Sequence, residues 1–393
     1  MSAVNFNELV SDRIKMVQGG EREALLKLSQ GIPDLIALGR GDPDLDTAPH
    51  ITEAAVEALR AGRTHYTHWA GKIELRRLIA EKLKRDNGLD YNPETELIVT
   101  TGAQQGMMAT MLALLNPGDE VIMGDPYYTS YSECVQIAGG KTVLVPTKEE
   151  NDFVLTAEEI SAYITDKTKL VVIVSPNNPT GTLTPAAELE KIAKLIVEKN
   201  LLAVSDEIYE KVRFEDYTHT SLASFPDMKE RTILLNGFSK AYSMTGWRIG
   251  YMAAPAALIG QMECLIHDMT ISVAEFVQCA AIKALEAGDD CIKATVAVYD
   301  ERRRALMKAF DVIGLKYTYP KAGLYMWVNI QSTGLSSYDF CKKLLLEGHV
   351  QLFPGTVYGH GEGYIRVSLL APTEKLKEAA DRIESVFLKK QEG

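Results

Sequence analysis

Short apolar runs rich in β-branched residues recur along the first two thirds of the chain, and helical patterns separate them. Examples are ELIVTT at 96–101, KLVVIVS at 169–175 and TILLNG at 232–237. Runs of this length without polar alternation are typical of strands that are covered on both faces. Strands that alternate with helices predict an α/β fold, with a mostly parallel sheet sandwiched between helices.

The last third of the chain carries a different pattern. Residues 316–330 (KYTYPKAGLYMWVNI) indicate strands around a turn, and YIRVSLL at 364–370 indicates another strand. The segment after it repeats its apolar residues with a helical period, which predicts a terminal helix with one buried face. These elements predict a smaller α+β unit.

The length of the chain predicts two domains, because 393 residues are too many for one ordinary core. We expect a large domain over 45–295. The smaller α+β domain is expected to combine the N-terminal segment 1–44 with 296–393. A long helix near 275–310 is expected to lead from the first domain into the second.

Composition argues against several classes of function. The formal net charge of −11 disfavours nonspecific binding to nucleic acid or to an anionic membrane surface. No apolar run reaches the length of a membrane span, and the N-terminus shows no apolar leader segment. We therefore expect no nucleic-acid partner, no membrane association and a cytoplasmic location.

Residue types that bind metals do not form a recognisable metal motif. The five cysteines are scattered without a CxxC pair, which indicates neither a disulfide framework nor a zinc site. His65 and His68 are three residues apart, but no third candidate ligand is nearby. We expect no metal ion.

Glycine and polar residues follow the predicted strands at the points where the strands end. In an open parallel sheet, ligands bind at this edge. Gly102, Ala103 and Gln104 open a helix, whose free N–H groups and dipole favour an anion such as phosphate. The other residues expected at this edge are Tyr128, Asn178, Asp206, Tyr209, Ser239, Lys240 and Arg248.

Each of these signals has an ordinary structural explanation when it is taken alone. The Asn-Pro-Thr-Gly stretch at 178–181 is common in turns. An aspartate at a strand end is often a helix cap, and a lysine in such a place is most often a surface residue. Only their expected meeting at one sheet edge favours a ligand site.

Taken together, these residues describe a planar ligand. An anion site would hold its phosphate, a tyrosine would stack on its ring, a carboxylate would pair with a ring nitrogen, and a lysine would bind its aldehyde. Pyridoxal 5′-phosphate has these features and needs a Schiff-base lysine and an acidic partner for its pyridinium nitrogen. We assign Lys240 as that lysine, because nearby cations and partial desolvation make an ammonium lose its proton more easily.

The motifs NGFSKAYSMTGWRIGY, SPNNPTG, SDEIYE and YIRVSL resemble those of the class I/II aminotransferases of PLP fold type I. RGDPDLDTAPH and HYTHWAGKIELR resemble the N-terminal half of the same family. The resemblance covers roughly residues 10–390. It implies an enzyme that moves the amino group of an L-amino acid to a 2-oxo acid, 2-oxoglutarate or pyruvate, by ping-pong chemistry between pyridoxal and pyridoxamine phosphate.

The same resemblance implies roles for individual residues. Lys240 would form the Schiff base and shuttle the proton, Asp206 would pair with the pyridinium nitrogen, and Tyr209 would bond the ring oxygen. Arg366 and the backbone of Gly41 would bind the substrate α-carboxylate. Asn178 would bond the ring oxygen and the substrate carboxylate. Ser239, Arg248 and the backbone of Ala103 and Gln104 would bind the phosphate. Tyr66 would reach the phosphate in the other subunit of a homodimer.

Two departures from the family pattern bear on the ring and on the substrate. Tyr128 stands where many relatives have a stacking tryptophan, and a phenol can also stack. Gln104 stands where aspartate-specific relatives have a lysine that reads the distal carboxylate. A neutral amide would need help from elsewhere to bind glutamate or 2-oxoglutarate. The sequence therefore disfavours a strict aspartate aminotransferase, and alanine, aromatic or other neutral donors become as plausible.

Two segments are expected to line the substrate pocket, because of their place in the family layout. These are residues 10–40 and the stretch MTISVAEFVQ at 269–278, with Val17 and Val273 as test positions.

Two other functions remain in competition. The same fold hosts C–S β-lyases, decarboxylases and related enzymes that share the lysine, aspartate, tyrosine and arginine. The third hypothesis is a non-enzymatic regulator that binds the cofactor. It is disfavoured because such regulators usually carry a DNA-binding module, and no basic helix-turn-helix segment precedes residue 10.

Overall fold

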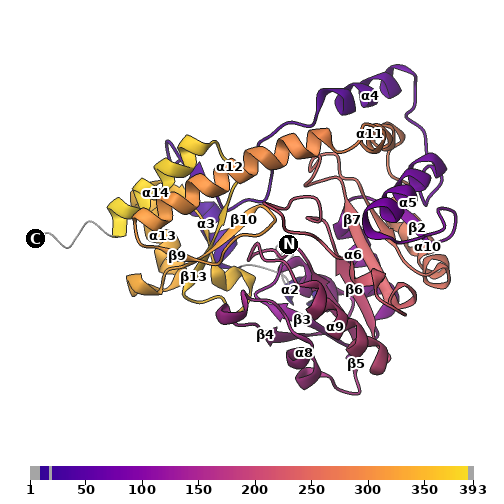
Figure 1. Cartoon of the computed structure of the whole chain (residues 1–393), viewed down its shortest axis with the longest axis horizontal. Coiled ribbons are helices and arrows are strands. Elements are labelled where there is room, and N and C mark those ends of the chain that lie inside the picture. The colour runs from indigo at the N-terminus through magenta and orange to yellow at the C-terminus, as the bar shows by residue number, and fades with distance from the viewer. Residues whose placement is uncertain (1–8, 17–19, 388–393) are drawn as a thin grey trace, which may run out of the picture.

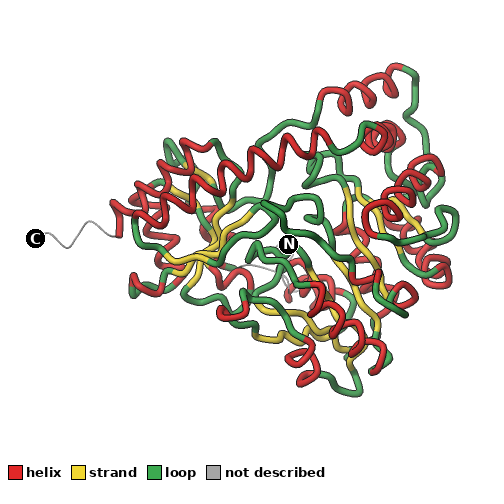
Figure 2. The backbone as a smooth tube through the Cα atoms, in the orientation of Figure 1, coloured by secondary structure: helices red, strands yellow, loops and turns green. Residues whose placement is uncertain are grey.

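The structure is a computed structural model of the 393-residue chain, and it describes residues 9–16 and 20–387. Figure 1 shows the course of the chain, and Figure 2 shows that its strands gather in separate groups. Helices surround the larger group and flank the smaller one.

A seven-stranded sheet forms the centre of the larger group. Its strand order is β2-β8-β7-β6-β5-β3-β4, and the pairs from β7 to β4 are parallel, whereas β8 runs antiparallel to both of its neighbours. The strands are β2 (Leu97–Thr100), β3 (Glu120–Asp125), β4 (Lys141–Pro146), β5 (Thr168–Val174), β6 (Leu202–Asp206), β7 (Thr232–Gly237) and β8 (Gly250–Ala253). The predicted mostly parallel mixed sheet is therefore confirmed, although the sequence patterns did not mark β4 or β8.

Successive residues of the central strands belong to different apolar clusters, as expected for strands buried on both faces. On β5, Val172 packs with the cluster under α6, α7 and α10, whereas Val171 and Ile173 pack with the cluster under α8 and α9. Helices α4, α5 and α11 cover the second face over β2, β7 and β8. The bounds are α4 (Pro49–Arg60), α5 (Ile73–Asn87), α6 (Ala103–Leu114), α7 (Ser130–Ile137), α8 (Ala157–Tyr163), α9 (Ala186–Glu198), α10 (Ala256–Thr270) and α11 (Glu275–Glu286).

The smaller group of strands contains two sheets. Four antiparallel strands follow the order β12-β13-β10-β9, and β1 pairs in parallel with β11, with Ile36 opposite Val350. The N-terminal α3 lies beside these C-terminal elements (Figure 1). The bounds are β1 (Ile36–Ala37), β9 (Lys316–Tyr317), β10 (Tyr325–Asn329), β11 (Val350–Gln351), β12 (Phe353–Pro354), β13 (Tyr364–Ser368), α2 (Asp12–Met16), α3 (Glu21–Leu28), α12 (Asp290–Val312), α13 (Ser337–Gly348) and α14 (Thr373–Phe387).

The terminal helix has the buried face that the sequence predicted. Leu376, Ala379, Ala380 and Ile383 of α14 are buried in one apolar cluster with Trp327 of β10. The period of 3.6 residues per turn places these four side chains on one side of the helix.

The predicted single helix near 275–310 is wrong in one respect, because the structure has two helices there. Helix α11 ends at Glu286 and α12 begins at Asp290. Gly288 lies between them with φ +75°, a left-handed conformation that ends helices and favours glycine. Helix α12 then runs from the large sheet to the smaller group of strands (Figure 1).

None of the helices in the described ranges is both long and apolar enough to cross a membrane.

Candidate active site

A cavity of about 470 Å³ opens at the carboxyl ends of β2, β6 and β7, and residues of β10, β12 and β13 close its other side. Its volume is in the range of small-molecule sites. The predicted site residues that line it are Gly41, Gly102, Ala103, Gln104, Tyr128, Asn178, Asp206, Tyr209, Ser239, Lys240, Arg248 and Arg366. Tyr66 is the exception, since its side chain is 77% exposed and does not line this cavity.

Lys240 enters the cavity from the turn that follows β7. Its partly buried side chain donates a hydrogen bond of 2.7 Å from Nζ to the carbonyl oxygen of Gly41, and Nζ lies 6.0 Å from the centre of the Tyr209 ring. Ser239 and Ala241 flank it with small side chains. Among the described residues, the lysine amine therefore has a carbonyl oxygen and no carboxylate as its hydrogen-bond partner.

Asp206 is the last residue of β6 and is 4% exposed. Its carboxylate accepts hydrogen bonds from the Tyr131 hydroxyl and from the Ile208 N–H, the second at 3.0 Å. Burial raises the pKa of this carboxyl group, and the hydrogen bond from Tyr131 opposes that rise. Within the described ranges, no cation forms an ion pair with Asp206, so this buried anion has room for a cationic ligand.

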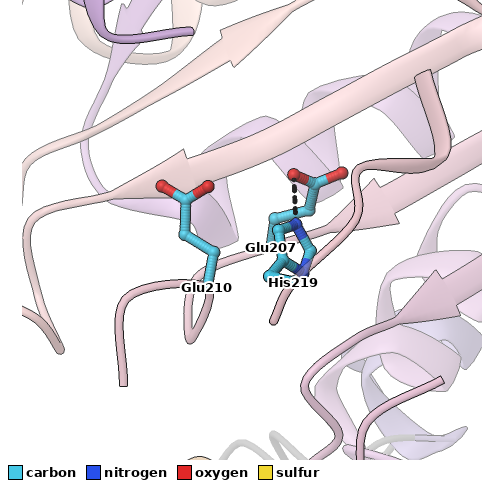
Figure 3. Close-up of side chains that lie close together, drawn as sticks. All are labelled: Glu207, Glu210 and His219. Carbon is cyan, nitrogen blue, oxygen red and sulfur yellow. Dashed lines mark hydrogen bonds and ion pairs between the residues drawn. The ribbon is translucent and has the colours of Figure 1, made fainter. Parts of the chain in front are cut away.

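Glu207 points away from the cavity, as expected for the neighbour of Asp206 in extended backbone. Its carboxylate accepts hydrogen bonds from the hydroxyls of Ser205 and Ser221 at 2.8 and 2.6 Å. His219 Nε2 lies 2.9 Å from the same carboxylate (Figure 3). These bonds fix the turn that follows Asp206.

Glu207, Glu210 and His219 are the described residues that come close enough to hold a metal ion (Figure 3). The Glu210 carboxylate already pairs with the buried ammonium of Lys82 and accepts a bond of 3.1 Å from Asn87. Because an ammonium and hydroxyl groups already satisfy these carboxylates, the cluster has the partners that a buried anion needs. We assign it a structural role, and the expectation of no metal stays a prediction.

Arg366 lies on β13, on the opposite side of the cavity, and is 4% exposed. Its guanidinium donates hydrogen bonds to Asn178 Oδ1 at 2.9 Å and to the Gly39 carbonyl oxygen at 2.6 Å. It stacks over the rings of Tyr325 and Tyr358 at 4.0 and 4.5 Å, and its Nε has no hydrogen-bond partner. In the described part of the chain, Arg366 pairs with no carboxylate.

The N-terminus of α6 forms the anion end of the cavity. Gly102 precedes this helix with φ +75°, and a Cβ atom there would lie 2.8 Å from the guanidinium of Arg248. Glycine therefore allows the arginine to approach the first turn of the helix. A helix N-terminus beside a guanidinium is a binding site for phosphate.

Aromatic residues line the space between these two ends. The ring of Tyr128 packs edge to face on Tyr131 at 5.3 Å, and the Tyr209 hydroxyl lies 3.4 Å from that of Tyr325. Gln104 donates to the Cys134 sulfur at 3.4 Å, so its amide has a partner outside the ligand space. Planar rings and hydroxyls suit a planar, oxygenated ligand.

Several residues of the cavity were missing from the sequence-based prediction. Tyr131 lies on α7, Tyr325 on β10 and Tyr358 after β12, and no local motif connects them with the strand ends. Arg22 of α3 was covered only by the general expectation that residues 10–40 line the pocket. Arg40 was also covered only in that way.

The two predicted pocket segments have different outcomes. Residues 22, 26, 39 and 40 of the predicted segment 10–40 line the cavity, whereas none of 269–278 does so in a single chain. Val273 is buried in the cluster around α11, and Val17 lies outside the described residues.

Pyridoxal phosphate fits the residues that line the cavity. The buried Asp206 carboxylate, which has no cationic partner in the described ranges, matches a pyridinium nitrogen, and the α6 N-terminus with Arg248 matches a phosphate. Lys240 offers an amine in the same cavity. Fold and site together define a pyridoxal-phosphate enzyme of fold type I.

Comparison with known proteins identifies the family. Residues 33–383 match the model for aminotransferase class I and II. The aspartate aminotransferase of Pyrococcus abyssi is 43% identical over 386 residues, covering 97% of this chain and 99% of that protein. The aromatic-amino-acid aminotransferase 2 of Thermococcus litoralis is 42% identical over 386 residues, with the same coverage of both.

A solved structure agrees with these matches. A single mutant of the Thermus thermophilus aspartate aminotransferase superposes with a TM-score of 0.92 at 38% identity, covering 96% of this chain and 99% of the other. The chain belongs to the class I and II aminotransferases and is a pyridoxal-phosphate-dependent transaminase.

Proposed function

We propose that the cavity transfers amino groups with Lys240 as the reacting amine. The main support is a pair of buried side chains of opposite charge on two sides of the cavity. Asp206 and Arg366 are each 4% exposed, and neither has an ionic partner among the described residues. A buried charge without a partner is costly, so each is expected to receive its partner from a ligand.

The bound cofactor supplies an electron sink for the carbanion that forms when an amino acid loses its α-proton. Lys240 would hold the cofactor's aldehyde, and its amine would move the proton at the substrate α-carbon. Asp206 would pair with the ring nitrogen, and Tyr209 and Asn178 would bond the ring oxygen.

Arg366 fixes the substrate through its α-carboxylate. Its Nε has no hydrogen-bond partner, Asn178 already holds one of its terminal nitrogens, and Gly41 lines the same cavity. A planar guanidinium binds a carboxylate with two parallel hydrogen bonds, which orients the α-carbon toward Lys240.

The other end of the ligand is held by the residues around the α6 N-terminus. We assign the phosphate to the backbone N–H groups of Ala103 and Gln104, to the Ser239 hydroxyl and to the Arg248 guanidinium. Gly102 leaves the space that this contact requires. Tyr128 stacks on the ring.

We further propose a homodimer in which Tyr66 reaches the phosphate in the other subunit. Support comes from its 77% exposed side chain and from exposed Ile271, which belongs to the segment next to the loop that carries Tyr66. An exposed aromatic beside exposed apolar residues marks an interaction surface. The proposed division into 45–295 against 1–44 and 296–393 is supported by the pairing of β1 with β11.

A cytoplasmic location stays a prediction. It is supported by the five cysteines, all of which are free thiols in the structure. Free thiols are usual in reducing compartments.

Mixing the cofactor-loaded protein with single amino acids, in the absence of any 2-oxo acid, tests the function directly. Amino transfer is expected to change the cofactor's absorption band in one turnover and to release one equivalent of 2-oxo acid per subunit. A β-lyase would instead release ammonia and pyruvate from cystathionine over many turnovers. A band that no amino acid changes would contradict both enzyme functions.

The relatives do not settle the amino donor, because their names include aspartate and aromatic-amino-acid aminotransferases. The same experiment ranks the donors of this enzyme.

A further inference from the structure

The cavity holds more positive charge than the proposed reaction uses. Its lining includes the cations Arg22, Arg40, Lys240, Arg248 and Arg366, against the anions Asp42 and Asp206. The proposed function assigns Lys240, Arg248 and Arg366 to the aldehyde, the phosphate and the α-carboxylate. Arg22 and Arg40 have no assigned partner.

Both arginines are free to bind an anion. In the described part of the chain, neither makes a hydrogen bond or ion pair. The guanidinium of Arg22 lies over the Phe353 ring, 5.6 Å from its centre. The remaining acid of the cavity, Asp42, accepts a hydrogen bond of 2.6 Å from the Thr245 hydroxyl. Two exposed guanidiniums in a cavity wall are suited to bind a carboxylate.

The position of Arg40 places it on the substrate side of the cavity. The residue before it, Gly39, accepts a hydrogen bond from Arg366, and the residue after it, Gly41, accepts one from Lys240. Arg40 therefore projects from the backbone that connects the α-carboxylate site with the reacting amine.

The position of Arg22 agrees with this placement. Phe353, which the guanidinium of Arg22 contacts, lies opposite Arg366 in the pairing of β12 with β13. Burial raises the pKa of Tyr358, and the positive charges of Arg366 and then Arg22 oppose that rise. Arg22 thus lies near the aromatic residues that also surround Arg366, on the side of the cavity formed by β12 and β13.

We propose that Arg22 and Arg40 are specificity-determining residues that bind the second carboxylate of a dicarboxylic amino acid or 2-oxo acid. The proposal rests on the proposed function, because it takes Arg366 as the partner of the first carboxylate. The two arginines would also supply the positive charge for the distal carboxylate that Gln104, a neutral amide, does not provide. The substrate side chain is thereby held from α3 and from the 39–42 segment, and not from α6.

Inhibitor binding to the cofactor-loaded enzyme tests the proposal without any turnover. Glutarate carries two carboxylates, whereas butyrate carries one, and both are titrated by calorimetry against the same enzyme. Glutarate should bind about 10- to 100-fold more tightly, because charged hydrogen bonds contribute about 1.5–3 kcal/mol. Equal affinities in the wild type would overturn the proposal.

Two variants then locate the effect. Arg22→Gln and Arg40→Gln should each reduce the preference for glutarate about tenfold, and the affinity for butyrate should stay within about twofold. Lys27→Gln is the matched control, since it removes one positive charge from the exposed side of the same helix α3, where Lys27 pairs with Glu23. A preference that both Gln variants retain in full would also overturn the proposal.

Turnover with glutamate and with leucine gives a second readout. The Gln variants should lose kcat/KM for glutamate about tenfold and keep that for leucine. Arg22→Lys and Arg40→Lys retain the charge and should keep most of the glutarate preference, and a loss as large as in the Gln variants would contradict a charge-based role. If no amino acid discharges the cofactor, the proposed function fails, whereas the binding comparison still decides this inference.

Discussion

The amine of Lys240 donates a hydrogen bond of 2.7 Å to the carbonyl oxygen of Gly41. The proposed reacting amine is therefore held, in the free protein, by the segment to which we assign an N–H contact with the substrate. An amine bound to the cofactor could no longer make this bond, so the contact between Lys240 and Gly41 belongs to the free protein.

Lys240→Ala should abolish turnover while the protein stays folded. A positioned proton-transfer group contributes about 10²–10⁴-fold to a rate, and the variant also loses the covalent hold on the cofactor, so kcat should fall by at least about 10⁴. Stopped-flow absorbance with a good amino donor measures this. Lys191→Ala, at an exposed ion pair on α9, is the control and should leave the rate unchanged. Transamination by Lys240→Ala at the wild-type rate would contradict the assignment.

Asp206→Asn should stabilise the cofactor-free protein although it removes activity. Burial raises the pKa of Asp206, so the folded state binds this proton more tightly than the unfolded state. The wild type therefore loses unfolding free energy as the pH rises above the unfolded value near 3.9, and the loss is complete only above the folded pKa. The Asn variant escapes this loss and should gain about 1–3 kcal/mol at neutral pH.

Urea unfolding of both cofactor-free proteins between about pH 5 and pH 8 measures the difference. The difference in unfolding free energy between the two proteins should become smaller as the pH is lowered toward the pKa that Asp206 has in the unfolded chain. Asp216→Asn changes an exposed residue, so its difference in unfolding free energy from the wild type should not vary with pH in this way. A wild type that becomes more stable relative to Asp206→Asn as the pH rises would show that Asp206 has a cationic partner in the free protein.

Arg366→Lys should weaken substrate binding more than it slows the chemical step. A lysine keeps the charge but loses the bidentate geometry, so kcat/KM should fall about 100-fold, with most of the change in KM. The same substitution at Arg382, whose side chain is partly exposed and pairs with Glu378 on α14, should have no effect on KM. A fall in kcat alone would place Arg366 in the proton transfer and not in binding.

Gly102→Ala should weaken cofactor binding about tenfold, because its new methyl group would lie 2.8 Å from the Arg248 guanidinium and displace it from the anion end of the cavity. Gly118→Ala provides a matched control. Gly118 also has positive φ, at +90°, but its Cβ would meet no atom within 4 Å. Both variants should lose stability, and only Gly102→Ala should lose affinity for the cofactor in a fluorescence titration.

Mixed dimers test the proposed contribution of Tyr66 across the interface. Lys240→Ala and Tyr66→Ala chains, refolded together, should form dimers in which one site has both a lysine and a tyrosine. Random pairing makes half of the dimers mixed with one complete site each, so about a quarter of the wild-type sites should be active. Activity no higher than the sum of the two variants alone would show that Tyr66 acts within its own chain or not at all.

The sequence predicted those site residues that end a strand of the large sheet or directly follow one. Lys240 comes just after β7 and Asp206 ends β6, so a parallel sheet brings them to one edge whatever the details of packing. Tyr131 and Tyr325 could not be found in this way, because they reach the cavity from α7 and β10 through tertiary packing. Gly41 and Arg366 were assigned only through the family resemblance, since neither follows a strand of the large sheet.

Local patterns also missed parts of the fold. Strand β8 has only four residues, Gly250–Ala253. It begins inside the motif NGFSKAYSMTGWRIGY, which shows no clear strand pattern. The break at Gly288 was hidden inside a long helical pattern, because apolar spacing continues on both sides of it. In both places the backbone geometry depends on neighbours that are distant in the sequence.

The pairing of β1 with β11 has a consequence for how the enzyme is made. Ile36 pairs with Val350, so 350 − 36 = 314 residues separate two partners that fix the segment leading to Gly39 and Gly41. At the usual speed of synthesis, about 5–20 residues per second, the earlier strand waits roughly 15–60 s for its partner to leave the ribosome. The large sheet can fold during that time, whereas the substrate side of the cavity is completed only as the chain ends. Under the proposed function, the phosphate end of the cavity can therefore form earlier than the substrate end.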